Sequence, residues 1–236
     1  MPTIQKRPCI RHISYAPVLA LILITGCHSN SYRKGDVAAR SMQMAAAEVK
    51  AESRAIDVTM ETLNDLVNKP GPDLKPQFLR FQGALDRLEE AAARTERSRA
   101  QAEARNKDYF NSWGHQVEDI QFGAVRDQSE NRRAAVTNRF HNVNARSVEA
   151  QAVVQPLISY LNDIQSALSA DLTTAGLDSV RGIVSNADQN ARKVQIALGE
   201  LAEELSDSSV ALSSHSGNAG PIQADAARVR SNEAVQ

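Results

Sequence analysis

The fold is decided by residues 73–122, which read DLKPQFLRFQGALDRLEEAAARTERSRAQAEARNKDYFNSWGHQVEDIQF. Large or small apolar side chains recur here at alternating steps of four and three residues, beginning with Leu74, Phe78, Phe81, Leu85, Leu88 and Ala92. Such a heptad pattern is typical of a long helix that packs on other helices along one line of side chains. Polar residues interrupt the line at Arg99, Asn106 and Gln116, where they more often fix the register than bind a ligand.

The same heptad pattern continues on both sides of this segment and predicts four helices. We expect them at residues 36–69, 73–122, 128–170 and 173–207. Short connections between helices favour antiparallel neighbours, so the predicted fold is all-α, an elongated antiparallel up-down bundle of coiled-coil-like helices. Residues 208–236 are rich in Ser, Gly, Asn and Ala and are expected to form a disordered tail.

The composition agrees with helices and gives little sign of catalysis. Of the 236 residues 42% are hydrophobic but only 4% aromatic, which disfavours sheets. No Gly-rich phosphate loop and no strand-to-helix elbow with a nucleophilic serine occurs. His115 and Glu118 lie one helical turn apart, but two solvated side chains are the simpler interpretation. We therefore expect no enzymatic activity, no cofactor and no metal.

The N-terminus has the features of an export signal. Lys6, Arg7 and Arg11 precede an apolar stretch at residues 16–25, which is too short to span a bilayer. The stretch ends in Ile24-Thr25-Gly26-Cys27, which resembles the lipobox of bacterial lipoproteins. The resemblance implies a signal peptide at residues 1–26 and a lipid on Cys27. The alternative is an ordinary secreted protein with a chance cysteine.

A lipidated Cys27 would begin a tether at residues 27–35 and place the protein in the bacterial cell envelope. His28 stands where an aspartate commonly retains lipoproteins in the inner membrane, so the resemblance favours the outer membrane, facing the periplasm. Loss of residues 1–26 leaves 24 basic against 28 acidic residues, a formal charge of −4. A nucleic-acid partner is therefore not expected.

Several short motifs resemble a bacterial lipoprotein family known as domain of unknown function 2959. They are Tyr109-Phe110-Asn111-Ser112-Trp113 with Glu118 and Phe122, Arg139-Phe140, Pro156-Leu157 and Tyr160-Leu161-Asn162. The resemblance covers roughly residues 27–206. It implies a lipoprotein but no assigned activity.

An aromatic group lies near the end of the second predicted helix: Tyr109, Phe110, Trp113 and Phe122. This helix exceeds the first by about 15 residues, so its end should overhang by ~22 Å, while a tether over residues 28–35 reaches ~29 Å. These aromatics are therefore a candidate membrane-proximal or partner surface. The alternative is that the rings pack the second helix against the third.

Arg132, Arg139 and Arg146 recur every seven residues and so form one stripe on the third predicted helix. The simpler interpretation is ion pairs to acidic residues of the helix at 173–207. The alternative is a docking surface for an anionic partner, such as a cell-wall polymer or an acidic protein.

The function expected from these features is that of a non-enzymatic, lipid-anchored scaffold, spacer or adaptor in the envelope. An accessory regulator that binds an envelope enzyme or transporter through one helix face is the alternative. A covalent cell-wall tether is weaker, because the known small lipoprotein of that kind ends in lysine and this chain ends in Ala234-Val235-Gln236. Beyond the membrane, the expected partner is an envelope protein or a cell-wall polymer, and homo-oligomerisation stays open.

Overall fold

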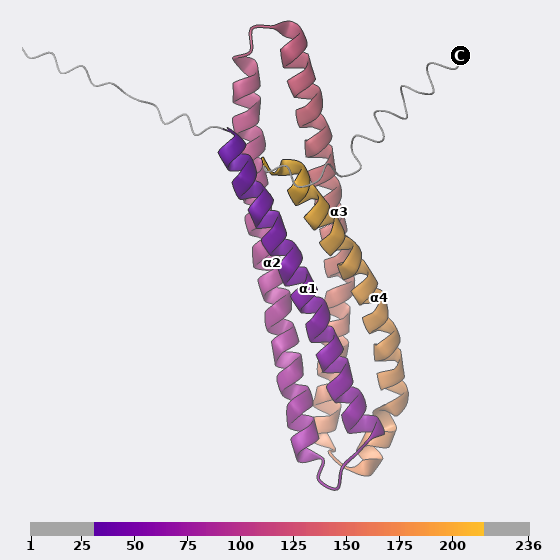
Figure 1. The fold of residues 1–236 in the computed structure, drawn as a ribbon. Coiled ribbons are helices and arrows are strands. Elements are labelled where there is room, and N and C mark those ends of the chain that lie inside the picture. The colour runs from indigo at the N-terminus through magenta and orange to yellow at the C-terminus, as the bar shows by residue number, and fades with distance from the viewer. Residues whose placement is uncertain (1–30, 215–236) are drawn as a thin grey trace, which may run out of the picture.

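The computed structural model describes residues 31–214, which form an all-helical antiparallel bundle (Figure 1). Its helices are α1 (Ser31–Asn68), α2 (Lys75–Glu118), α3 (Gly123–Ala170) and α4 (Thr174–Leu212). The predicted fold class is confirmed, and the described residues contain no strand. The expectations for the signal peptide, Cys27 and residues 215–236 lie outside the described part of the chain.

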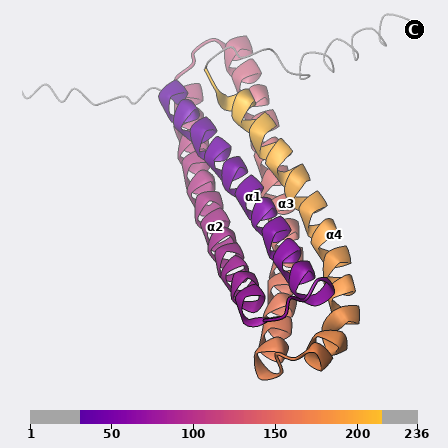
Figure 2. The same cartoon turned by 60° about the horizontal axis from the view of Figure 1, so that its bottom comes forward.

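The four helices form a square in which each packs on its two neighbours in chain order, with α4 returning to α1. Helix α1 packs most extensively, on α2 and α4, whereas α3 makes fewer contacts with its neighbours (Figures 1 and 2). At 1.5 Å per residue, a helix of α3's length spans about 70 Å, so the bundle is a rod. Within the described range, no helix has the length and apolar character needed to cross a membrane.

The core follows the predicted heptads but is wider than one line of side chains. On α1 the expected line includes Met42, Val49, Ile56 and Leu63, all of which are buried. A second buried line runs beside it, made of Ala45, Glu52, Thr59 and Leu66. Both lines are needed because α1 faces two neighbouring helices at once. The predicted core residue Ser53 is only half-buried, and its neighbour Glu52 takes the buried position.

Helix α1 begins at Ser31 rather than at Asp36, so the predicted tether is shorter than expected. The first turn is held by α2, since Ser31 Oγ donates to Ser112 Oγ at 3.0 Å and Lys34 pairs with Asp108 at 2.9 Å. Gly35 is buried in this turn. A Cβ there would lie 3.1 Å from the Tyr109 ring, so glycine permits the close approach of α1.

The turn between α2 and α3 also lies earlier than predicted. Helix α2 ends at Glu118 instead of residue 122, and α3 begins at Gly123 instead of residue 128. The backbone carbonyl of Phe122 accepts hydrogen bonds from the amides of Val125 and Arg126, which starts α3 at Gly123. Residues 124–127, expected between the two helices, are exposed positions of α3.

The other two connections are fixed by single side chains. Gln77 donates to the carbonyl oxygens of Asp65 and Lys69 and accepts from the Gly71 amide, which closes the α1–α2 loop. In the α3–α4 loop the Thr173 hydroxyl caps α4 by accepting from the Gly176 amide at 3.1 Å. A Cβ on Gly176 would lie 2.1 Å from the Asp171 carbonyl oxygen, so only glycine fits there.

Helix α4 continues past residue 207, where the disordered tail was predicted to follow at 208. Ser208, Ser209 and Leu212 are buried on the bundle. The Ser214 amide and hydroxyl both donate to the Asp36 carboxylate at 2.9 Å. The end of α4 is therefore joined to the start of α1, and the composition rich in small polar residues does not prevent helix formation.

One hairpin, residues 113–131, projects beyond the first residue of α1 and the end of α4 (Figure 1). Ser31 lies level with Ser112, and Arg132 Nη2 donates to the Ala211 carbonyl at 3.2 Å, so these contacts mark its base. Only six residues of α2 follow Ser112, instead of the expected overhang of 15. The earlier start of α1 and the earlier end of α2 both shorten it.

Candidate functional site

Three of the four aromatic residues singled out in the sequence pack inside the bundle. Ring centroids are 5.4 Å apart for Tyr109 and Phe110 and 5.5 Å for Tyr109 and Trp113. Phe110 also lies 5.9 Å from Phe140 of α3. Burial raises the pKa of Tyr109. These rings join α2 to α3 and to the first turn of α1. This arrangement matches the alternative in which the rings pack the second helix against the third instead of forming a surface.

Trp113 and Phe122 differ in their surroundings. Trp113 is half-buried, and its Nε1 donates to Ser129 Oγ of α3 at 3.0 Å. Phe122 is 78% exposed at the tip of the hairpin and makes no ring contact with the other aromatics of the described chain. Only Phe122 of the predicted group is therefore available as a surface.

The three arginines of the stripe on α3 face α4, and each contacts a residue of that helix. Arg132 donates to the Ala211 carbonyl, Arg139 lies 3.7 Å from Asp207, and Arg146 pairs with Glu200 at 3.0 Å and with Glu204 at 2.6 Å. The predicted ion pairs to the fourth helix are thus present. Arg139 and Arg146 are paired within the bundle, whereas Arg132 stays exposed with one hydrogen bond to a backbone carbonyl.

A different set of arginines lines a groove of about 300 Å³ between α1 and α2. It is lined by three arginines and one acid, Arg54 of α1 with Arg87, Arg94 and Glu90 of α2, and by the small or apolar residues Ala51, Ala55, Val58 and Ala84. Arg94 pairs with Glu48 and Glu90, at 3.3 and 3.9 Å. Arg54 and Arg87 have no ion-pair partner within residues 31–214. We call this feature the arginine groove.

The arginine groove continues into an apolar line on the outer side of α1. Val37, Met44, Ala51 and Val58 recur every seven residues, and the exposed fractions of Val37, Met44 and Val58 are 38%, 57% and 43%. Sequence reasoning missed both features because the buried heptad beside them is stronger. The signal was nevertheless present as a second apolar repeat of seven, together with Arg80, Arg87 and Arg94 at the same spacing on α2.

Comparison with known proteins places nearly all of the bundle in one family. The model of a family described as protein of unknown function (DUF2959) matches residues 27–210. The chain belongs to the DUF2959 family. No curated protein and no solved structure matches the chain.

In this DUF2959 protein one acidic side chain is fully enclosed by the bundle. Glu52 of α1 is 0% exposed, and neither carboxylate oxygen has a hydrogen-bond partner among the described residues. Burial raises the pKa of Glu52, and the nearby hydroxyl of Thr95 opposes part of that shift. The Thr95 Oγ1 atom also lacks a hydrogen-bond partner, so the pair is close without forming a bond of good geometry.

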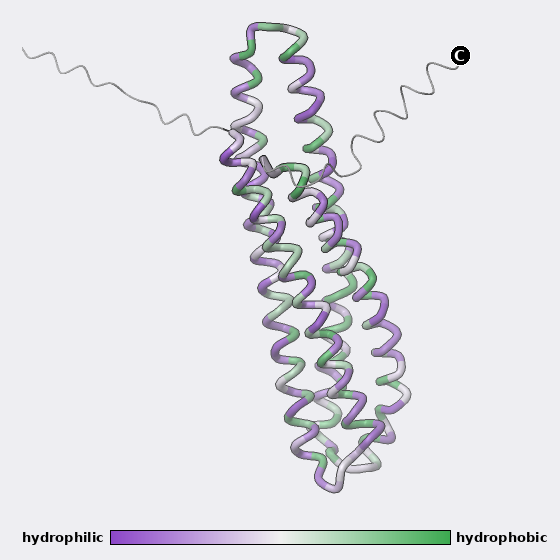
Figure 3. Tube along the Cα trace, in the orientation of Figure 1, coloured by the Kyte–Doolittle hydropathy of each residue, from purple (hydrophilic) through white to green (hydrophobic). Residues whose placement is uncertain are grey.

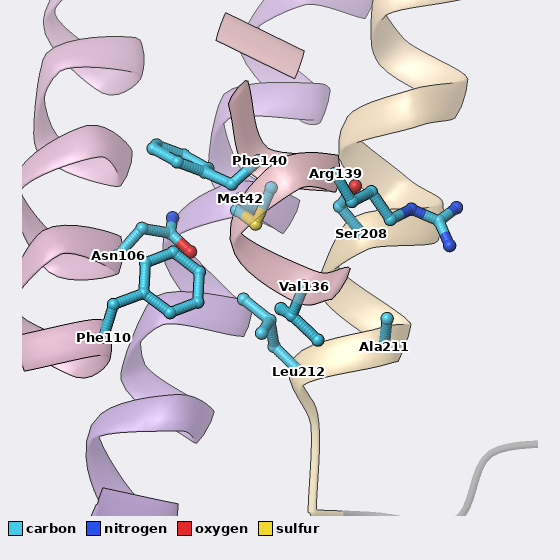
Figure 4. A pocket seen from close by; sticks show the side chains of 9 residues that line it. All are labelled: Met42, Asn106, Phe110, Val136, Arg139, Phe140, Ser208, Ala211 and Leu212. Atoms are coloured by element: carbon cyan, nitrogen blue, oxygen red, sulfur yellow. The ribbon is translucent and has the colours of Figure 1, made fainter. Parts of the chain in front are cut away.

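A second polar spot borders a small cavity where all four helices meet (Figure 4). Asn106 is buried and donates to the Ala102 carbonyl at 2.8 Å, while its Oδ1 and the Ser208 Oγ have no partner in the described chain. The cavity measures only about 10 Å³, the space of one water molecule. The DUF2959 core therefore offers room for a water here but not for a larger ligand.

The pair His115 and Glu118, for which the sequence favoured two solvated side chains over a metal site, lies at the surface of the hairpin. His115 Nδ1 lies 3.7 Å from Glu118 Oε2, and both side chains are exposed. Between Ser31 and Ser214 no group of three His, Cys, Asp or Glu side chains is placed to hold a metal ion. The arginine groove and the hairpin tip are thus the features of this DUF2959 rod that call for a function.

Proposed function

We propose that this DUF2959 protein is a non-enzymatic, lipid-anchored adaptor of the bacterial cell envelope. It holds an acidic, helical partner in the arginine groove at a fixed distance from the membrane. The arginine groove carries this proposal, since Arg54 and Arg87 have no ion-pair partner among residues 31–214 and stand beside small side chains. A rod with a groove along its side suits the positioning of a bound partner better than the catalysis of a reaction.

The lipid anchor is supported by the residues that precede the bundle. The lipobox-like Ile24-Thr25-Gly26-Cys27 follows a short apolar stretch, and the family match begins at Cys27. Helix α1 starts four residues later, at Ser31. His28 after the cysteine favours the outer membrane, facing the periplasm. An anchor so close to a rigid helix would couple the rod's position to the bilayer.

A helical partner suits the arginine groove because of its shape and charge. The groove runs between two antiparallel helices, and the alanines that line it let a third helix approach closely. Val37, Met44 and Val58 extend the apolar contact along α1. Carboxylates on the partner would pair with Arg54 and Arg87, as charges flanking coiled-coil contacts commonly do. A small anion would gain less, because the groove is open to solvent.

The first prediction is that Cys27→Ala abolishes the anchor. The variant should not incorporate a palmitate analogue, should keep its signal peptide or be cut elsewhere, and should leave the outer-membrane fraction. Metabolic labelling and membrane fractionation measure this. Wild-type labelling and fractionation of the variant would show that Cys27 carries no lipid.

The second prediction is that Arg54→Glu with Arg87→Glu removes the partner from the arginine groove. Reversing both charges should repel an acidic helix, so proteins recovered after crosslinking of intact envelopes should be lost. The matched control is Arg97→Glu with Arg105→Glu, which reverses two exposed arginines of α2 that lie outside the groove and have no ion-pair partner in the described part of the chain. Equal recovery from the two double variants would reject the groove as the docking site.

The same crosslinking experiment separates the adaptor from the alternative function. An adaptor or scaffold should recover several structural envelope proteins through the groove. An accessory regulator should recover one enzyme or transporter, whose activity then changes when Arg54 and Arg87 are reversed. The arginine groove favours both functions over a passive spacer, because a spacer needs no docking face.

A further inference from the structure

The tip of the hairpin exposes apolar side chains to solvent. The side chain of Phe122 is 78% exposed and that of Val125 is 56% exposed. Their backbones are nevertheless ordered, because the Val125 amide donates to the Phe122 carbonyl at the start of α3. Figure 3 shows the hairpin beyond the rest of the bundle, and its helical arms contact one another through Trp113 and Ser129. No other helix of the described chain covers the tip, so an outside partner is needed to bury these two side chains.

The hairpin projects from the end of the rod at which the chain leaves toward Cys27. Past the level of Ser31, α2 continues for six residues, which corresponds to ~9 Å along the helix axis. The nine residues of α3 that precede Arg132 correspond to ~13 Å. The tip therefore lies on the order of 10 Å beyond the first described residue of the bundle.

The distance from the bundle to the proposed anchor is of the same size. Cys27 and Ser31 are four residues apart, so their separation is at most ~14 Å even for fully extended backbone. An acyl chain on Cys27 keeps that residue at the bilayer surface. The surface then lies within ~14 Å of Ser31, and the hairpin reaches ~9 to 13 Å beyond the level of Ser31, so the two lengths are comparable.

We propose that the hairpin tip is a membrane contact in which Phe122 and Val125 enter the interface of the bilayer that holds the Cys27 anchor. This inference rests on the lipid anchoring proposed above and adds a second point of contact. Two points of contact fix the tilt of a rod on a surface, whereas one point does not. The arginine groove is then held at a set height and direction above the membrane.

The charges at the tip indicate that the contact depends on the anchor. Glu118, Asp119 and Asp127 outnumber Arg126 around the two apolar side chains. An anionic bilayer therefore offers the tip no electrostatic attraction, and two apolar side chains are too few to recruit the protein. With the anchor in place, the tip is already concentrated at the surface, and a weak apolar contact becomes populated.

The expected contact with the bilayer involves only part of the aromatic group that the sequence singled out. Tyr109, Phe110 and Trp113 are committed to packing between α2, α3 and α1, so they stay in the bundle. Only the tip residues are free to enter lipid. The experiment therefore needs a probe at residue 122 itself and not at the native tryptophan.

The chain permits a single-site probe, because Cys9 and Cys27 are its only cysteines. In the mature protein Cys9 is removed and the Cys27 sulfur is blocked by lipid under the proposed processing. Phe122→Cys labelled with the fluorophore NBD is reconstituted in vesicles of phosphatidylethanolamine and phosphatidylglycerol that contain brominated lipid. We expect the label to lose most of its emission relative to vesicles without bromine.

The matched control is Leu79→Cys with the same label. Leu79 is also an exposed apolar residue, 52% exposed, but it lies at the opposite end of α2, 39 residues before Glu118 or ~59 Å along the axis. Its emission should not respond to brominated lipid. Energy transfer from this label to a lipid-borne acceptor should rise in Phe122→Ser with Val125→Ser, because the rod is then free to tilt.

The outcomes separate the tip contact from the anchor. A wild-type protein that does not float with the vesicles overturns the lipid anchor and the tip contact together. Flotation without quenching at residue 122 overturns the tip contact alone. A label at 122 that is protected from aqueous iodide but not quenched by lipid overturns it in favour of a protein at the tip, including a second copy of this chain.

Discussion

Leu161→Asp should lower the free energy of unfolding by about 3–5 kcal/mol, because it places an uncompensated carboxylate in the interior. Leu161 of α3 is 0% exposed and belongs to the continuous core of the bundle. The substitution also removes the apolar area that the leucine side chain buries. Domains of this kind are stable by only about 5–15 kcal/mol, so much of the fold's stability is at stake. Urea unfolding followed by circular dichroism at 222 nm measures the loss.

The control for Leu161→Asp is Val148→Asp on the same helix. Val148 is 61% exposed, so the new carboxylate stays solvated and the free energy of unfolding should change by less than about 0.5 kcal/mol. The two variants make the same kind of change, from an apolar side chain to aspartate. Coincident unfolding curves for them would mean that α3 does not present Leu161 to a core.

The heptad pattern predicted the number and order of the helices because it reflects burial directly. A long helix that packs on its neighbours must place apolar residues on one side, and Pro70-Gly71-Pro72 stops the first helix for reasons local to the chain. Both features can be recognised from neighbouring residues alone, without knowing which distant residues they contact. The antiparallel arrangement then follows from short loops.

The helix ends were harder to predict because they depend on contacts between helices. Gly35 suggested a polar, non-helical tether, but it lies in α1 because the Tyr109 ring of α2 packs against it. Ser208 and Ser209 suggested a tail, but both are buried in α4, which packs on α1 and α3. In each case a distant contact overrides a weak local preference.

The candidate surfaces were predicted only in part. The arginine stripe on α3 was visible, and one of its two interpretations matches the ion pairs to α4. The arginine groove was not visible, because it combines Arg54 with Arg87, which are brought together only by the pairing of α1 with α2. The repeats of seven on α1 and α2 are each present in the sequence, but neither repeat by itself shows that the two helices pair to form a groove.

Glu52 shows most clearly why one heptad line does not predict all the buried residues of α1. The buried line Ala45, Glu52, Thr59 and Leu66 has two polar members, so its repeat is invisible in hydrophobicity. It is buried because α1 faces both α2 and α4. An acid at such a position costs stability, and the cost varies with pH.

Glu52→Met should raise the free energy of unfolding near neutral pH by about 1–3 kcal/mol, the penalty of a buried polar group without a partner. The carboxylate oxygens of Glu52 have no hydrogen-bond partner in the described chain, and a thioether of similar length needs none. Glu52→Gln should give a smaller gain, since the amide removes the charge but keeps unpaired polar atoms. Urea unfolding at several pH values measures both effects.

The pH dependence has a definite sign because burial raises the pKa of Glu52 in the folded state. Below the pKa of the unfolded chain, about 4.3, both states hold the proton and Glu52 contributes no slope. Above it the folded state keeps a proton that the unfolded state loses, so wild-type stability falls until the raised pKa of the folded state is passed. The advantage of Glu52→Met should therefore grow from pH 4 toward neutrality. Glu61→Met, at an exposed position of α1, should show no such growth. A pH-independent difference between wild type and Glu52→Met would mean that the carboxylate reaches water in the folded protein.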